Sequence, residues 1–287
     1  MQVNLCANKE EKDRFGGLFL LINAFKTDMS IGMRLRPALG AAAKHLGLSV
    51  LVAALSAALV FGLWYPTPYG ALAGGFALFG LIVTVDVVCG PLLTMVVFDR
   101  RKPRRELLRD VGVIVALQLA ALFYGLYSVM QARPLFLAYE GNRFRVVSVA
   151  DVDASKLPEA LPEFRSFSYS GPRLVGAKLT EATDPNFKDS VLQSMAGLHP
   201  SFRPERWVTY ESLLPQVQAA LLPLSTLKQK HPEAAASIDQ ALSAEGLKES
   251  AAGYLPIDAE KADPPDWVVL VERSSGLPKA FLPLDGW

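Results

Sequence analysis

Residues that commonly carry out chemistry are few in this sequence, and they do not form known catalytic motifs. The three histidines have no metal-ligating partner at helical spacing, and His199 and His231 each precede a proline, unlike His45. The chain lacks the Gly-x-Ser-x-Gly, His-Glu-x-x-His and Gly-Lys-Ser/Thr motifs of hydrolases, zinc proteases and nucleotide-binding proteins. We therefore expect no catalytic residue, no metal and no cofactor, although a triad assembled from distant residues would escape this search.

One carboxylate, Asp86, lies within the apolar segment 70–98. A charge at mid-membrane depth costs about 2.5–3.5 kcal/mol on insertion scales, so Asp86 should face protein or water, or be protonated. Counting helical rise from the ends of the neighbouring apolar segments places Ser56 and Tyr124 at a similar depth. They are the expected intrachain hydrogen-bond partners of Asp86.

Three roles remain open for Asp86: a structural contact between helices, a contact with a partner's transmembrane helix, or transport of a proton or ion. Transport normally needs more than one ionisable group, and the three apolar segments hold only this one. Pro91 removes the helical hydrogen bond to the carbonyl of Val87 and should kink the helix one turn from Asp86. The candidate intramembrane contact residues are thus Asp86, Pro91, Tyr124 and Ser56.

Two aromatic residues of the C-terminal part, Trp207 and Tyr210, lie near Arg203 and Arg206. They are candidates for an exposed patch that contacts a partner outside the membrane. The alternative is that both rings pack in a core with a solvated basic rim.

Three apolar segments must position the intramembrane residues. Charged residues make up 20% of the chain, below the roughly 25% of ordinary soluble proteins, and the deficit is concentrated in segments 46–65, 70–98 and 111–130. A helix that crosses a bilayer needs about 20 mostly apolar residues, so each segment is expected to be a span. We predict a membrane α-helical fold of three transmembrane helices (domain 33–130), followed by an α+β extracytoplasmic domain (131–287).

Basic residues set the expected orientation. They cluster before the first span and in link 99–110, whereas link 66–69 is uncharged. By the positive-inside rule, the N-terminus and the second link are cytoplasmic and the C-terminal domain is on the other side. The rival interpretation, a cleaved signal peptide ending near Ala71–Ala73, conflicts with an apolar run longer than the usual 7–15 residues.

The first 32 residues fit this pattern poorly. Their apolar segment, 15–25, is too short to span a bilayer, and Met33 is a suitable start. We expect 1–32 to be a poorly ordered extension from a mis-assigned start; the alternative is an amphipathic segment on the membrane surface.

The C-terminal domain reads as hairpins at both ends with helices between them. Strand patterns flank Gly141-Asn142 and Ser274–Gly276, and helical patterns begin after Asp184-Pro185, near Leu214 and at Pro232. Neither Cys6 nor Cys89 lies in this domain, so it cannot hold a disulfide or a cysteine metal site. The basic excess of the chain lies in the membrane part, so the sequence gives no support for nucleic-acid binding.

The sequence from Trp64 to Arg133 resembles the type IV pilin accessory proteins (the TfpX/TfpZ family), and a weaker resemblance extends over Met33 to Trp287. It is carried by Trp64-Tyr65-Pro66-Thr67-Pro68-Tyr69, Asp86-Val87-Val88-Cys89-Gly90-Pro91-Leu92-Leu93-Thr94, Val96-Val97-Phe98, Glu106–Asp110, Leu117–Gly125, Arg133-Pro134, and the late Pro265-Asp266-Trp267 with Ser275-Gly276.

The resemblance implies a non-enzymatic helper of pilus biogenesis in the bacterial inner membrane, with a periplasmic domain. Its implied partners are the cognate type IV pilin, major or minor, other pilus assembly proteins and membrane lipid. No catalytic residue can be carried over. The alternatives are a membrane-bound enzyme that modifies pilin or envelope glycan, and a sensor, for which the short cytoplasmic link is too small an output module.

Overall fold

The structure is a computed structural model of the 287-residue chain, and it describes residues 36–99 and 101–287. The extension expected at 1–32 lies outside these residues. The described chain forms two compact units: residues 36–54 with Ile82–Phe123, and Leu55–Leu81 with Tyr124–Trp287. This division differs from the domain boundary expected at residue 130, because one end of each apolar helix packs with the C-terminal domain.

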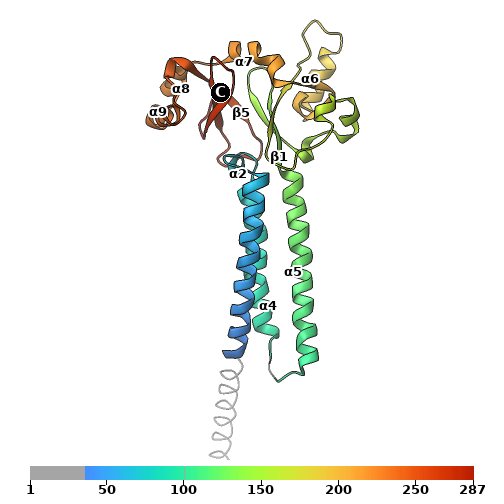
Figure 1. Cartoon of the computed structure of the whole chain (residues 1–287). Coiled ribbons are helices and arrows are strands. Elements are labelled where there is room, and N and C mark those ends of the chain that lie inside the picture. Colours follow the sequence, from blue (N-terminus) through green and yellow to red (C-terminus); the bar gives the residue numbers. More distant parts are fainter. Residues whose placement is uncertain (1–35, 100) are drawn as a thin grey trace, which may run out of the picture. The chain divides into compact units, whose positions relative to one another are not determined.

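Three helices are long and apolar enough to cross a membrane, as the sequence predicts (Figure 1): Arg36–Trp64, Gly75–Val97 and Arg104–Ala132. Their apolar 18-residue windows have mean hydropathies of 2.4, 2.2 and 2.0. The first ends in the π turn η1 (Val60–Trp64) and is followed by the short helix α2 (Tyr69–Leu72). The second consists of α3 (Gly75–Thr84), η2 (Val85–Cys89) and α4 (Gly90–Val97), and the third is α5 (Arg104–Ala132). The first and third helices begin before their apolar segments, since a helix can continue into polar residues outside the hydrocarbon.

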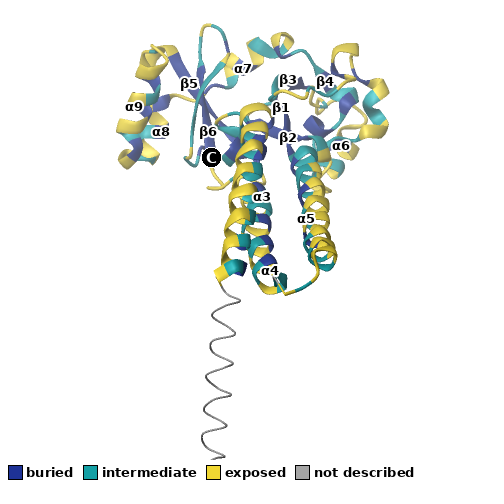
Figure 2. Ribbon diagram, turned by 60° about the horizontal axis from the view of Figure 1, so that its bottom comes forward, coloured by how far each residue is buried: buried dark blue, intermediate teal, exposed yellow. Residues whose placement is uncertain are grey.

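The outward faces of these helices are apolar and exposed, as the yellow ribbon of Figure 2 shows. Leu55, Leu117 and Phe123, for example, are exposed over 65%, 65% and 67% of their surfaces. Soluble monomers rarely expose such continuous apolar surface. A lipid environment explains it.

The interruption expected at Pro91 takes the form of a π turn. The second helix widens over Val85–Cys89 and returns to α geometry at Gly90, with Pro91 in the first turn of α4. A π turn is one way in which a helix accommodates a residue that cannot donate its backbone N–H. Asp86 lies within this widened turn.

The C-terminal domain contains a mixed seven-stranded sheet in the order β4-β3-β1-β2-β5-β6-β7. Its strands are β1 (Pro134–Tyr139), β2 (Phe144–Ser148), β3 (Arg173–Ala177), β4 (Trp207–Val208), β5 (Ala252–Asp258), β6 (Trp267–Glu272) and β7 (Pro278–Leu282). The hairpins predicted around Gly141 and Ser275 are confirmed as the antiparallel pairs β1–β2 and β6–β7. The α+β class is therefore confirmed as well.

The two halves of the sheet meet at a narrow seam. Strands β2 and β5 run parallel and pair only through Phe144 with Ile257 and Arg145 with Asp258. Each half has its own core. One includes Phe136, Phe164 and Trp207, and the other includes Leu227, Ile238 and Leu270.

Helices and 3-10 turns cover the sheet. The α-helices are α6 (Phe187–Met195), α7 (Leu214–Ala220), α8 (Leu224–Lys230) and α9 (Ala235–Ala244). The 3-10 helices are η3 (Val149–Asp151), η4 (Ala154–Glu159), η5 (Pro162–Phe164), η6 (Pro200–Phe202), η7 (Pro204–Arg206), η8 (Tyr210–Leu213), η9 (Pro232–Ala234) and η10 (Glu249–Ala251). Helices thus occur in each region where the sequence predicts them.

The link between the first two spans packs against the C-terminal domain within one compact unit. The amide of Asp263 donates to the carbonyl of Ala71 (3.2 Å), and that of Gly171 donates to Leu63 (2.9 Å). The Tyr65 hydroxyl donates to the Val129 carbonyl (2.9 Å) and its ring is buried. These backbone contacts hold the link in a fixed position on the domain.

Candidate functional site

A narrow cleft lies among the three apolar helices, inside the first compact unit. Its volume is about 70 Å³. The walls are mostly apolar, and its lining is His45, Leu48, Ser49, Val52, Asp86, Val115, Gln118, Leu119 and Leu122. The predicted carboxylate is therefore accompanied by three polar side chains that the sequence did not single out, His45, Ser49 and Gln118.

Asp86 is buried, with 9% of its surface exposed, and its Oδ1 atom has no hydrogen-bond partner. Gln118 reaches across from α5, and its Nε2 atom donates to the backbone carbonyl of Asp86 (3.1 Å). His45 contacts the second helix elsewhere, with Nδ1 at 2.5 Å from Thr94 Oγ1. Within the described residues, no basic side chain forms an ion pair with the Asp86 carboxylate.

Gly90 makes the Gln118 contact possible. A Cβ atom at position 90 would lie 2.0 Å from Gln118 Nε2, far inside van der Waals contact. The close approach of the amide to the π turn therefore requires glycine at this position.

The other predicted intramembrane residues have different environments. Pro91 opens α4 beside the π turn. Ser56 is buried, whereas Tyr124 exposes 75% of its surface. Both belong to the other compact unit, and their hydrogen bonds to Asp86 stay a prediction.

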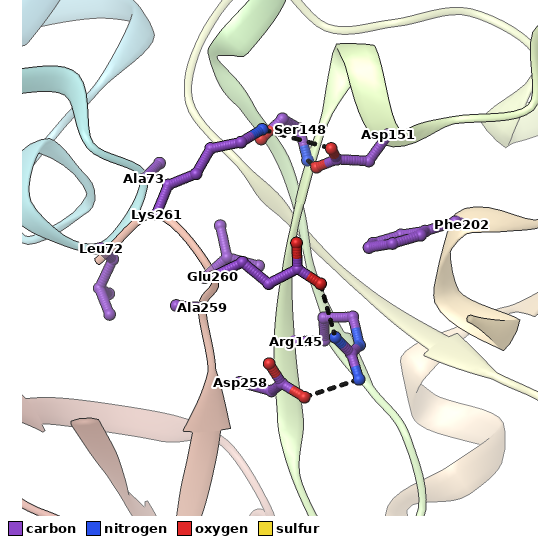
Figure 3. A pocket seen from close by; sticks show the side chains of 11 residues that line it. Leu72, Ala73, Arg145, Ser148, Asp151, Phe202, Asp258, Ala259, Glu260 and Lys261 are labelled. Carbon is purple, nitrogen blue, oxygen red and sulfur yellow. Dashed lines mark hydrogen bonds and ion pairs between the residues drawn. The ribbon is translucent and has the colours of Figure 1, made fainter. Parts of the chain in front are cut away.

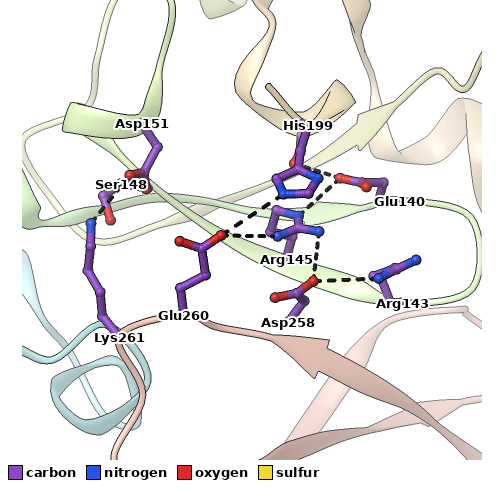
Figure 4. Close-up of polar contacts among 10 residues, drawn as sticks. Glu140, Arg143, Arg145, Ser148, Asp151, His199, Asp258, Glu260 and Lys261 are labelled. Atoms are coloured by element: carbon purple, nitrogen blue, oxygen red, sulfur yellow. Dashed lines mark hydrogen bonds and ion pairs between the residues drawn. The ribbon is translucent and has the colours of Figure 1, made fainter. Parts of the chain in front are cut away.

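In the C-terminal domain, a cluster of charged residues occupies the seam between β2 and β5 (Figure 4). The side chain of Arg145 is only 3% exposed and contacts three carboxylates. Its Nη2 lies 2.7 Å from Asp258, its Nε lies 3.3 Å from Glu140 and its Nη1 lies 3.9 Å from Glu260. Arg145 thereby joins the loop after β1 to the end of β5.

Further contacts complete this cluster. Ser201 Oγ donates to Glu140 (2.7 Å), and Arg143 lies 3.5 Å from Asp258. His199 Nε2 is 4.0 Å from Glu260. Burial, and next the positive charge of Arg145, lower the pKa of His199 below its ordinary value. The cluster therefore joins acidic and basic side chains from both halves of the sheet.

A small pocket of about 20 Å³ adjoins this cluster (Figure 3). Leu72 and Ala73 of the first link face it from one side, and Lys261 crosses it toward Asp151, with Nζ 3.3 Å from Oδ1. Its volume suits a single water molecule. It is too small for an organic substrate.

A larger groove of about 650 Å³ lies between the β1–β2 turn and α6. The sequence places apolar residues on one face of α6, and the structure exposes that face: only Ser190 of this helix is buried. Leu192 and Met195 expose 62% and 80% of their surfaces. We call the exposed apolar surface of this helix, formed by Phe187, Val191, Leu192 and Met195, the α6 face; Phe187, Val191 and Met195 also line the groove.

The exposed aromatic patch expected at Trp207 and Tyr210 is wrong. Both residues are buried, with 2% and 1% of their surfaces exposed. Trp207 Nε1 donates to the Ser201 carbonyl (2.8 Å), and the Tyr210 hydroxyl donates to the Gly276 carbonyl. Because both polar atoms have backbone partners, the rings pack in the core without cost, as the alternative interpretation held.

The described residues include no group of three or more His, Cys, Asp or Glu side chains that could hold a metal ion. The carboxylates of Glu140 and Asp258 are paired with the guanidinium of Arg145.

Comparisons with known proteins point to one family. A family profile described as "Fimbrial assembly protein FimB" matches residues 33–74. Two proteins of Dichelobacter nodosus, the fimbrial assembly proteins of serogroups I and E1, are 34% and 33% identical to this chain over 237 residues, which is 82% of this chain and 91% of each relative. The corresponding protein of serogroups C1 and C2 is 42% identical over 116 residues, 40% of this chain and 88% of that relative.

No solved structure is significantly similar to the chain. The relatives of serogroups I and E1 are matched over more residues than either the spans or the C-terminal domain contains, so the similarity includes both parts. The chain belongs to the fimbrial assembly protein family.

Proposed function

We propose that this membrane protein is a non-enzymatic accessory factor of type IV pilus assembly, which binds its cognate pilin and modulates pilin incorporation into the pilus. The observation that carries this proposal is the similarity over 237 residues to proteins named for fimbrial assembly. Because the similarity spans the membrane helices as well as the C-terminal domain, both parts belong to the shared role.

The proposed orientation places the N-terminus in the cytoplasm and the C-terminal domain in the periplasm, with the spans in the inner membrane. The basic residues of the link at 99–110 support it through the positive-inside rule. The contact of the first link with the C-terminal domain supports the placement of both on the same side of the membrane, since two crossings separate them.

Two surfaces are the proposed contacts with pilin. In the membrane, they are the cleft around Asp86, with Pro91; Ser56 and Tyr124 stay candidate contacts from the sequence. Outside it, the α6 face replaces Trp207 and Tyr210 as the candidate, because its apolar side chains are exposed. Apolar residues that gather on one surface of a soluble domain commonly mark a protein interface.

The proposal is tested by deleting the gene and measuring pilus number and pilin level. We expect one of the two to change and to be restored by the intact gene. If both stay unchanged, the protein has no part in pilus assembly. Mass spectrometry of the pilin distinguishes the enzymatic alternative, since a modification lost on deletion indicates a modifying enzyme.

Binding itself is tested by crosslinking in the native membrane. A photoreactive residue at position 192, on the α6 face, should capture pilin, and one at position 240, exposed on α9, should not, because α9 packs on the other half of the sheet. Equal capture at both positions, or capture at neither, would remove the α6 face as a pilin contact.

A further inference from the structure

Two buried acceptor atoms in the intramembrane cleft lack a hydrogen-bond donor. They are Oδ1 of Asp86 and Oε1 of Gln118. Buried polar atoms in proteins almost always have a partner, because an unsatisfied one costs desolvation free energy. Both atoms belong to residues that line the same cleft, so the cleft as a whole needs donors.

The geometry explains why Gln118 presents its oxygen. Its amide nitrogen already donates to the Asp86 backbone carbonyl (3.1 Å), so its oxygen is the end of the amide that remains available. The π turn of the second helix and the missing side chain of Gly90 hold this arrangement. The π turn carries the Asp86 carboxylate and, through its backbone carbonyl, holds the Gln118 amide in the same cleft.

The described part of the chain, residues 36–99 and 101–287, does not supply the donor itself. Among the described residues, no lysine or arginine forms an ion pair with Asp86, and the His45 ring atom that contacts a polar group does so at Thr94. A primary ammonium group carries three N–H donors and a positive charge. It satisfies a carboxylate and an amide oxygen together.

We propose that the cleft binds a primary ammonium group carried by a transmembrane helix of a partner protein. Asp86 lies twelve residues before Phe98, about 18 Å along the helix at 1.5 Å per residue. The ammonium of a lipid headgroup lies at the interface, whereas a side chain or chain end of a helix reaches this depth. The apolar walls of Leu48, Val52 and Leu119 suit the helix that carries the group.

The inference rests on the proposed function for the existence of a membrane partner, but its test uses a synthetic helix, so the two can fail separately. The full-length protein is reconstituted in phosphatidylcholine bilayers. The probe is a fluorescent leucine–alanine transmembrane peptide with one lysine at mid-depth. A matched peptide has methionine in place of the lysine, and binding is measured by energy transfer.

We expect the wild-type protein to bind the lysine peptide about tenfold more tightly than the methionine peptide, the scale of a charge-assisted hydrogen bond. Asp86→Asn should abolish this preference, whereas Asp86→Glu should keep most of it. Gly90→Ala should weaken it by displacing Gln118, and the matched Gly112→Ala, whose Cβ would have no atom within 4 Å, should not.

Equal binding of the two peptides by the wild-type protein, or binding of neither, overturns the proposal. Retention of the preference in Asp86→Asn also overturns it. That result is expected if Asp86 is protonated and donates to Gln118, since asparagine keeps a donor there. Loss of the preference in phosphatidylethanolamine bilayers would overturn the assignment to a helix and assign the ammonium to a lipid.

Discussion

The buried arginine at the sheet seam offers a sharp test of how the C-terminal domain is held together. We consider Arg145→Met, which keeps most of the side-chain volume and removes the charge. In the wild-type protein, Arg145 neutralises Glu140, whose side chain is 8% exposed, and bonds Asp258 across the seam at 2.7 Å. The substitution therefore leaves a buried carboxylate with Ser201 as its remaining donor.

The magnitude follows from this burial. Removing one partner of a buried ion pair typically costs about 3–5 kcal/mol, because the remaining charge stays desolvated. The backbone pairing cannot compensate, since β2 and β5 share only two residue pairs. For a domain of this size, about 2–4 °C of unfolding temperature corresponds to 1 kcal/mol, so we expect a decrease of roughly 6–20 °C.

The assay is thermal unfolding of the full-length protein in detergent, followed by tryptophan fluorescence. Trp207 and Trp267 are buried in the two different halves of the sheet and report on both. The matched control is Lys156→Met, which removes an exposed ion pair with Glu159 and should change little. Adding Glu140→Gln to Arg145→Met should recover part of the loss.

If Arg145→Met and Lys156→Met lower the unfolding temperature equally, the cluster does not hold the seam. If Glu140→Gln recovers nothing in the double variant, the cost does not come from an uncompensated carboxylate. Either outcome refutes the reasoning from burial.

Two further predictions concern the same domain. The pKa of His199 is lowered in the folded state. Below about pH 6.5, the unfolded chain therefore binds more protons than the folded chain, and the unfolding free energy should fall as the pH decreases. His199→Gln should make the fall in unfolding temperature at acidic pH shallower. If the dependence of unfolding temperature on pH is unchanged, this fall does not come from His199. Leu192→Ser on the α6 face should change the free energy of unfolding by less than about 0.5 kcal/mol and reduce pilin capture. By contrast, Leu227→Ala, at a fully buried position, should cost about 2–5 kcal/mol in chemical unfolding.

Much of the fold was predictable because it depends on local patterns. Span length follows from bilayer thickness, and the turns at Gly141 and Ser275 mark the two hairpins. Strand β5 was not predicted, because Gly253 and Pro256 interrupt its pattern. Its pairing with β6 along the whole strand outweighs these weak local preferences.

The candidate site was predictable only in part, for a geometric reason. Asp86 stands out because a charge in an apolar segment needs an explanation. Gln118 does not stand out, since its role depends on reaching across to a helix where Gly90 leaves room. Such a contact depends on which faces of the two helices meet. Counting residues from the ends of a span gives the depth of a residue but not the face on which it lies.

The burial of single side chains could not be predicted from the sequence either. Trp207 lies beside arginines in the sequence, yet its ring packs in a core with Phe136 and Phe164, and its indole nitrogen donates to the Ser201 carbonyl. The reverse holds for α6, whose apolar periodicity is that of a core helix although its apolar face is exposed. A face that packs against a partner and a face that packs in a core have the same pattern.

The docking of the first link on the C-terminal domain can be tested at Gly74. Its φ is +68°, and a Cβ there would lie 2.9 Å from the Lys261 carbonyl oxygen. In Gly74→Ala, the left-handed backbone and the close contact together should cost roughly 1–3 kcal/mol. The Asp263 amide donates to Ala71 in the same contact, so its hydrogen exchange should accelerate by about 5- to 100-fold. The matched Gly62→Ala, whose Cβ has no atom within 4 Å, should leave this exchange unchanged. Unchanged exchange in Gly74→Ala would mean that the link does not rest on the domain, and the placement of both on one side of the membrane would lose this support.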